Sequence, residues 1–106
     1  MRTALIVGRL ESVVENAEEG LHLADVKVLG STGIDDVRSA FAEGNVDVVI
    51  MGAGIDLDSR LEIVRAIFEL SDSTSVHMKD RQSGPQGFLP FIRSVLSATA
   101  SPATTS

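Results

Sequence analysis

The chain has 106 residues, 43% of them hydrophobic, which is enough for the core of one compact domain but too short for two. It contains no cysteine, which excludes disulfides, thiolate zinc sites and a cysteine nucleophile. Its net charge of -6 repels a nucleic-acid backbone, so we expect no nucleic-acid binding. The apolar run at residues 3 to 7 is too short for a signal peptide or a membrane span, so we expect a cytoplasmic protein without membrane contact.

The first half of the chain alternates between strand and helix patterns. Residues 3 to 7, TALIV, predict a buried strand, and residues 10 to 21 carry apolar side chains at helical spacing. Residues 26 to 30, VKVLG, predict a second strand. A second helix follows, with Ser31 or Thr32 as its cap. Its expected buried stripe is Ile34, Val37, Ala40 and Phe41, and residues 44 and 45 end it.

The second half continues the alternation. Residues 46 to 52 predict the most continuous strand, as in the centre of a parallel sheet covered on both faces. A third helix follows, with Asp58 as its N-cap and with Ser59 and Glu62 at capping-box spacing. Its apolar face consists of Leu61, Val64, Ile67 and Phe68, with Ile63 and Leu70 beside it.

The last third of the chain adds one strand and one helix. Residues 74 to 78 predict a fourth strand, and a glycine-rich loop follows over residues 79 to 87. The last helix is defined by Phe88, Leu89, Ile92, Val95 and Leu96, with Pro90 in its first turn. We expect one domain over residues 1 to 97 and a flexible Ser/Thr/Ala/Pro tail over residues 98 to 106. Four strand–helix repeats predict an α/β fold, with a parallel sheet between helices.

Residues 48 to 57, VVIMGAGIDL, are similar to the strand and glycine turn of a dinucleotide-binding site. Gly52 and Gly54 fill the first two glycine places, but Leu57 fills the third, where it keeps helix and strand apart. The motif also follows the third strand and not the first, so we expect no dinucleotide. Two alternatives stay open: a turn that needs glycines, or backbone amides that bind a small anion ahead of a helix.

A wider pattern resembles the receiver domain of response regulators. It consists of the strand VKVLG, the turn at residues 44 and 45, the strand that follows Asp47, and the amphipathic helix around Arg65. TALIVGRLESV is similar to the first receiver strand and helix, and GFLPFIRSVL to the last helix. The resemblance covers residues 3 to 78 and the last helix. It implies a three-layer, flavodoxin-like α/β sandwich of the Rossmann-like kind.

The chemistry of that family does not carry over. Receivers accept a phosphoryl group on an aspartate that ends the third strand, where this chain has Gly52. They bind magnesium with acids that end the first strand, where this chain has Gly8 and Arg9. These residues supply no carboxylate nucleophile and no oxygen ligands, so we expect a degenerate receiver with neither metal nor cofactor. Asp56 and Asp58 leave a shifted metal site as the weaker alternative.

The length of the chain sets the size of the sheet. Residues 79 to 87 leave no room for a fifth strand and its preceding helix. We therefore expect a four-stranded parallel sheet in the order 2-1-3-4, with the fourth strand as an open edge. Exposed edges must be blunted or paired. This predicts a homodimer, formed through the fourth-strand edge or through the last helix.

A ligand would bind beyond the carboxyl ends of strands one and three, where the strand order reverses. The candidate ligand residues are Gly8, Arg9, Gly52, Gly54, Asp56, His77, Lys79 and Arg81. His77 is either a general base or a structural strand residue. Residues 79 to 81 form either an anion site or a solvated loop, and residues 83 to 87 either a lid or a plain connection.

Two main functions follow from these observations, beside the lesser alternative of a subunit whose open strand edge joins a larger assembly. The first is a non-enzymatic, non-phosphorylatable binding or regulatory module that acts through protein contacts, as a homodimer. The second is a small-ligand-binding protein or enzyme, which would bind a phosphate- or carboxylate-bearing metabolite or nucleotide between strands one and three.

Overall fold

A computed structural model describes residues 2–9, 26–52, 54–79 and 87–98. The strands are β1 (Arg2–Val7), β2 (Val26–Ser31), β3 (Val48–Met51) and β4 (Ser75–Met78). The helices are α2 (Ile34–Glu43), α3 (Leu57–Leu70) and α4 (Phe88–Ala98). The helix predicted over residues 10 to 21 and the tail beyond Ala98 lie outside the described residues.

The four strands form one parallel sheet in the order β2-β1-β3-β4, as predicted. β1 pairs with β2 and β3, so that the two central strands lie side by side. Asp47 fixes this register just before β3, because its amide donates to the Thr3 carbonyl at 2.9 Å and its carboxylate accepts from the Thr3 amide at 2.8 Å. The order and the layers are those of a flavodoxin-like fold.

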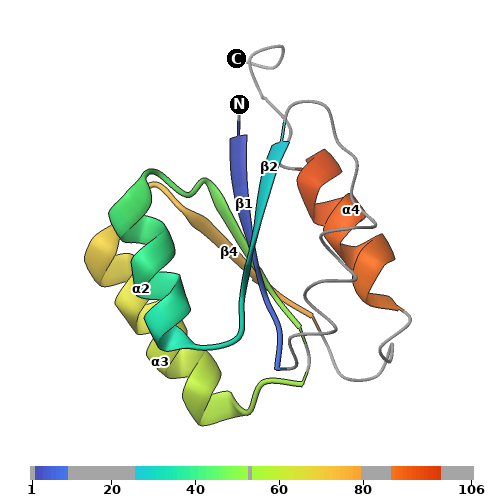
Figure 1. Ribbon diagram of the computed structural model, residues 1–106. Coiled ribbons are helices and arrows are strands. Elements are labelled where there is room, and N and C mark those ends of the chain that lie inside the picture. The colour runs from blue at the N-terminus through green and yellow to red at the C-terminus, as the bar shows by residue number, and fades with distance from the viewer. Residues whose placement is uncertain (1, 10–25, 53, 80–86, 99–106) are drawn as a thin grey trace.

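The sheet lies between two layers of helices (Figure 1). α2 and α3 cover one face, with a core of Leu5, Val7, Val37, Ala40, Val46, Val49, Met51, Ile55, Ile63 and Ile67. α4 covers the other face, with a core of Ala4, Ile6, Val48, Ile50, Phe88, Ile92, Val95 and Leu96. Alternate residues of β1 and β3 thus face opposite cores, as the period of a strand requires. This arrangement explains why both strands are apolar throughout.

The helix caps differ from the prediction. The N-cap of α2 is Gly33, because Ser31 still belongs to β2 and its hydroxyl donates to the Gly33 carbonyl at 2.9 Å. The N-cap of α3 is Asp56, one residue before Leu57. Asp58 lies inside the first turn, where a negative charge is favourable beside the helix dipole.

The buried face of α3 also differs from the prediction. The residues that α3 buries are Ile63, Ala66 and Ile67. Leu61 and Phe68, which share the predicted apolar face with Ile67, are more than half exposed. The spacing of Leu57, Leu61 and Phe68 places them on one side of the helix. α3 therefore has two apolar faces, of which only one packs on the sheet.

Within the described residues, no helix combines the length and the apolar character that crossing a membrane requires.

Candidate functional site

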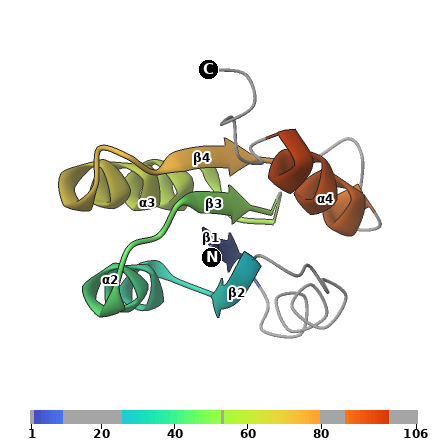
Figure 2. The same ribbon diagram turned by 90° about the horizontal axis from the view of Figure 1, so that it is seen from above.

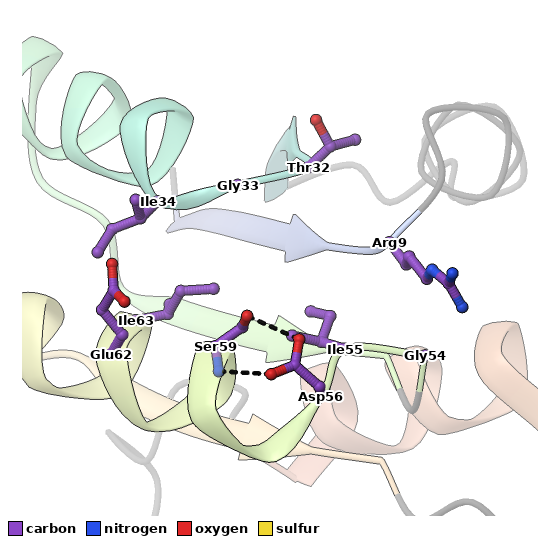
Figure 3. A pocket seen from close by; sticks show the side chains of 10 residues that line it. All are labelled: Arg9, Thr32, Gly33, Ile34, Gly54, Ile55, Asp56, Ser59, Glu62 and Ile63. Carbon is purple, nitrogen blue, oxygen red and sulfur yellow. Dashed lines mark hydrogen bonds between the residues drawn. The ribbon is translucent and has the colours of Figure 1, made fainter.

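A hollow of about 440 Å³ lies at the carboxyl ends of the strands, on the side of the sheet that α2 and α3 cover (Figure 3). Its lining comes from the loop after β1, from the first turn of α2, and from the loop and first turns of α3. The lining residues are Arg9, Thr32, Gly33, Ile34, Gly54, Ile55, Asp56, Ser59, Glu62 and Ile63. The hollow thus lies where the strand order reverses, which is the position predicted for a ligand.

Three of the predicted ligand residues meet at this hollow: Arg9, Gly54 and Asp56. Arg9 is exposed and extends over Gly54, away from the first turns of the two helices (Figure 3). A Cβ atom built on Gly54 would lie 3.4 Å from the Cβ of Arg9. Gly54 therefore lets the arginine side chain pass close to the backbone of the loop.

Asp56 acts as the cap of α3. Its carboxylate accepts from the Ser59 hydroxyl at 2.7 Å and from the Ser59 amide at 3.1 Å (Figure 3). These two hydrogen bonds, the hydroxyl's first, lower the pKa of Asp56 below its usual value. Asp56 is consequently a charged structural carboxylate, and its oxygens are already engaged. It is poorly suited to act as a general base.

Gly8 and Gly52 lie at the same end of the sheet but do not line the hollow. Both are buried, and their amides continue the sheet ladder. The Gly8 amide donates to the Ser31 carbonyl at 3.0 Å, and the Gly52 amide donates to the Val7 carbonyl at 2.8 Å. The amide of Gly52 is therefore engaged within the sheet, which removes one of the donors expected for an anion.

The space beside Gly52 is occupied by α4. A Cβ atom on Gly52 would lie 3.5 Å from the ring of Phe88 and 3.7 Å from the Val7 carbonyl oxygen. A side chain at this position would therefore point toward the Phe88 ring and not into the hollow. The end of β3 faces an apolar ring where a phosphoacceptor would need open, polar surroundings.

Two further predicted ligand residues, His77 and Lys79, do not line the hollow. His77 lies on β4, with its Nε2 atom 3.2 Å from the Ser75 hydroxyl. Lys79 is only 2% exposed, so the expectation that it lies on a solvated loop or lines the hollow is wrong. Its amide donates to the Met51 carbonyl at 2.9 Å, which ties the end of β4 to β3. Arg81 and the predicted lid over residues 83 to 87 lie outside the described residues, apart from Gly87.

The chemistry available in the hollow is limited. Its lining contains one cation, Arg9, and two acids, Asp56 and Glu62. Its one described hydroxyl–carboxylate pair, Ser59 with Asp56, is the cap of α3. In the parts of the chain that the structure describes, no three His, Cys, Asp or Glu side chains are grouped as a metal site would need. The geometry suits a small polar molecule held by hydrogen bonds.

A second candidate site is an exposed apolar surface that the sequence did not predict. We call it the α3–β4 surface and define it by four side chains with their exposed fractions: Leu57 (66%), Leu61 (55%), Phe68 (56%) and Met78 (45%). Among the described residues, every exposed large hydrophobic side chain belongs to α3 or β4, and the fifth of them is Leu70. The available signal was the width of the apolar arc of α3, which is too broad for one buried face.

The position of this surface follows from the two sides of α3. Glu62 and Ile63 line the hollow together with Ile34 of α2, so that side of α3 faces α2. The helical spacing of Leu61 and Phe68 places them on the other side of α3. α3 itself lies beside β4 on this face of the sheet (Figure 2). Val76 packs against the core beneath α3, and Met78, two residues later, points to the same face of the sheet. The four side chains therefore lie along the β4 edge of the molecule.

Comparisons with protein-family models, with curated proteins and with solved structures found no match for this chain.

Proposed function

We propose that this chain is a receiver-like binding or regulatory module that acts through contacts with another protein and has no phosphoryl-transfer chemistry of its own. The observation that carries the proposal is the α3–β4 surface. Its four side chains leave roughly 400 Å² exposed, since side chains of this size carry about 150–250 Å² each. A contiguous apolar patch of about 300–600 Å² is the largest that a typical monomer has, and it is often functional.

The size of this surface is sufficient to contribute to binding. At about 25 cal/mol per Å², burying roughly 400 Å² is worth about 10 kcal/mol before the costs of association are subtracted. Those costs are about 4–15 kcal/mol, so a partner must add hydrogen bonds or further area of its own. The unpaired backbone groups of an edge strand are a source of such hydrogen bonds.

The absence of phosphoryl-transfer chemistry is supported by the ends of β1 and β3. Gly8 and Arg9 follow β1, and Gly52 follows β3, so no carboxylate stands where receivers keep theirs. The ring of Phe88 lies beside Gly52, so the surroundings of the phosphoacceptor position are apolar there. A module with this fold can bind a partner, but it lacks the carboxylates with which receivers accept a phosphoryl group and bind magnesium.

The proposal is tested by a photo-crosslinking amino acid placed at Leu61, with the same amino acid at Arg38 as control. Both positions are exposed, but Arg38 lies on α2, away from the α3–β4 surface. We expect the probe at Leu61 to give one defined protein adduct, which Phe68→Glu abolishes, and the probe at Arg38 to give none. Equal labelling from both positions, or an adduct that persists with Phe68→Glu, would contradict the proposal.

A second candidate function is binding of a small anionic metabolite in the hollow. The observation that favours it is the meeting of Arg9, Gly54 and Asp56 in a space of about 440 Å³, which is within the usual range for ligand sites. The test is a thermal-shift panel of nucleotides, sugar phosphates and carboxylic acids. A ligand at 100 times its dissociation constant stabilises the fold by about 2.7 kcal/mol. Arg9→Ala should remove such a shift, and a panel without shifts would eliminate this function.

A further inference from the structure

We infer that the partner of the α3–β4 surface is a second copy of this chain. The two β4 strands pair antiparallel around a two-fold axis at His77, and the two sheets become one continuous sheet. The inference rests on the proposed function and names the partner for the same surface. It follows from three features of the described residues: the direction of the free backbone groups of β4, the apolar side chains along them, and the charge of this edge.

The backbone of β4 presents hydrogen-bonding groups to the outside. The Ser75 amide donates to the Asp47 carbonyl at 3.1 Å and the Lys79 amide to the Met51 carbonyl at 2.9 Å, so both point toward β3. Since backbone groups alternate in direction along a strand, the amides and carbonyls of Val76 and Met78 point away from β3, to the open edge. These are the groups that a pairing strand would engage.

The direction of these groups sets the register. In an antiparallel pair, residues that exchange hydrogen bonds must both point toward the partner. With the axis at His77, Val76 of one protomer lies opposite Met78 of the other, and the two His77 residues form the non-hydrogen-bonded pair between them. Each such hydrogen-bonded pair exchanges two hydrogen bonds, so the strand pairs along its whole length.

The same two-fold axis brings the apolar side chains together. α3 runs along β4 on one face of the sheet (Figure 2), so the two α3 helices would lie side by side across the axis. Leu57, Leu61 and Phe68 of each copy would then cover those of the other. Both copies together contribute about 800 Å² of apolar side chain, which is half of the about 1,600 Å² that a standard interface buries. The paired strands and the flanking residues supply the rest.

The charge of this edge permits self-association of an acidic chain. The chain carries a net charge of -6, so two copies repel each other in general. β4 contains no acidic residue, and on α3 the exposed Arg65 beside Leu61 and Phe68 is accompanied by the exposed acids Asp58 and Glu69. Pairing of the two β4 strands would therefore bring no acidic side chains of β4 together.

Two other surfaces fit a second copy less well. The opposite edge strand, β2, carries the exposed Lys27, and charged side chains of this kind protect edges from pairing. The last helix, α4, buries its large apolar residues in the core. Its exposed residues are Pro90, Arg93, Ser94, Ser97 and Ala98. The β4 edge is therefore favoured over the last helix, which the sequence left as an equal alternative.

The test uses the absence of cysteine in the chain, because one introduced cysteine is then the only thiol. In the proposed register, the two Cα atoms at position 77 are about 4.5 Å apart, which is within the range of a disulfide. We expect His77→Cys to cross-link under mild oxidation roughly 1,000-fold faster than Ser39→Cys, since the effective concentration within a dimer is millimolar and the protein is micromolar. Ser39 is an exposed residue on α2 and serves as the matched control.

Sedimentation equilibrium supplies the second measurement and does not depend on the folding of the cysteine variant. We expect the wild-type chain to sediment at twice its monomer mass of 11.2 kDa, and Phe68→Glu to sediment as a monomer with an unchanged circular dichroism spectrum. The inference is overturned if the wild type is a monomer, if Phe68→Glu stays dimeric, or if a folded His77→Cys variant cross-links no faster than Ser39→Cys. A monomeric wild type whose Leu61 probe still labels a different protein would overturn this inference alone and leave the proposed function intact.

Discussion

At the scale of single residues, the end of the sheet that the sequence marks as a ligand site is largely used for structure. Asp56 caps α3 through Ser59, and the amides of Gly8 and Gly52 extend the sheet. The sequence could not assign these roles, because they depend on the residue at which each element begins. Asp56 and Asp58 are both possible caps, and the choice between them follows from the path of the loop after β3.

The capping role of Asp56 predicts a pH-dependent stability. Asp56→Ala should lower the melting temperature at neutral pH, and Asp56→Asn should lower it less, because asparagine caps about as well as aspartate. The folded-state pKa of Asp56 is lowered, so its charge contributes stability above the unfolded value of 3.8. That contribution is lost as the pH falls from 3.8 through the lowered folded-state pKa.

Melting curves of wild type, Asp56→Ala and the control Asp58→Ala between neutral and strongly acidic pH check this prediction. The gap between wild type and Asp56→Ala should narrow below pH 3.8. The control should lose less than Asp56→Ala, because Asp58 adds a favourable charge to the first turn without capping it. A gap that is independent of pH, or an equal loss in the control, would show that the Asp56 charge does not cap α3.

Gly52 allows a second prediction at this scale. Its surroundings accept a methyl group at ordinary contact distances, with Phe88 at 3.5 Å. Gly52→Ala should therefore stabilise the fold by about 0.4–1 kcal/mol, because alanine reduces the freedom of the unfolded chain. Urea denaturation measures the change. A loss of more than about 1 kcal/mol would instead indicate that the turn after β3 requires a glycine.

At the scale of elements, the sequence predicts every described helix and strand, but not every end or face. The strand predicted over residues 46 to 52 is confirmed only as Val48–Met51. Strand and helix periods are local properties and can be read from spacing. The face that a helix buries depends on the neighbours that it meets in the fold, which is why Ile67 and Phe68 were grouped together although the structure separates them.

This difference in burial predicts unequal losses of unfolding free energy from substitutions at two adjacent residues of α3. Ile67 is fully buried, so Ile67→Ala should cost about 2–5 kcal/mol of unfolding free energy. Phe68 is mostly exposed, so Phe68→Glu should change the stability of the monomer by no more than about 0.5 kcal/mol. Denaturation must be measured at low protein concentration, since dimerisation itself adds apparent stability.

Comparable losses from both substitutions in dilute solution would contradict the assignment of Phe68 to a free surface. A large loss of unfolding free energy from Phe68→Glu alone would mean that α3 buries the side of the helix that carries Phe68 and not the side that carries Ile67. Phe68→Glu provides the sharper of the two tests, because it introduces a charge that a buried site could not accept without a partner.

At the scale of the whole molecule, the sequence predicts the topology better than the site. The order β2-β1-β3-β4 is confirmed, since four strands with right-handed crossovers and the receiver-like pattern leave few alternatives. Arg9, Gly54 and Asp56 meet as predicted because β1 and β3 are neighbours in the sheet. Lys79 does not join them, because it follows the edge strand β4 and is buried there.

The same topology explains why the α3–β4 surface is exposed along one edge of the sheet. β4 is the edge of the sheet, and α3 packs beside it with more apolar side chains than the sheet can bury. Only the assembled fold places these two features together. The central claim is therefore that β4 pairs with β4 of another copy while α3 packs against its counterpart.

Amide hydrogen exchange in the wild-type protein, measured residue by residue at increasing protein concentration, tests this claim most directly. The amides of Ser75 and Lys79 donate to β3 and should be protected at every concentration. The amides of Val76 and Met78 should exchange freely in dilute solution and gain protection as the concentration rises. Rapid exchange of Val76 and Met78 at every concentration, with Ser75 and Lys79 protected throughout, would contradict the account.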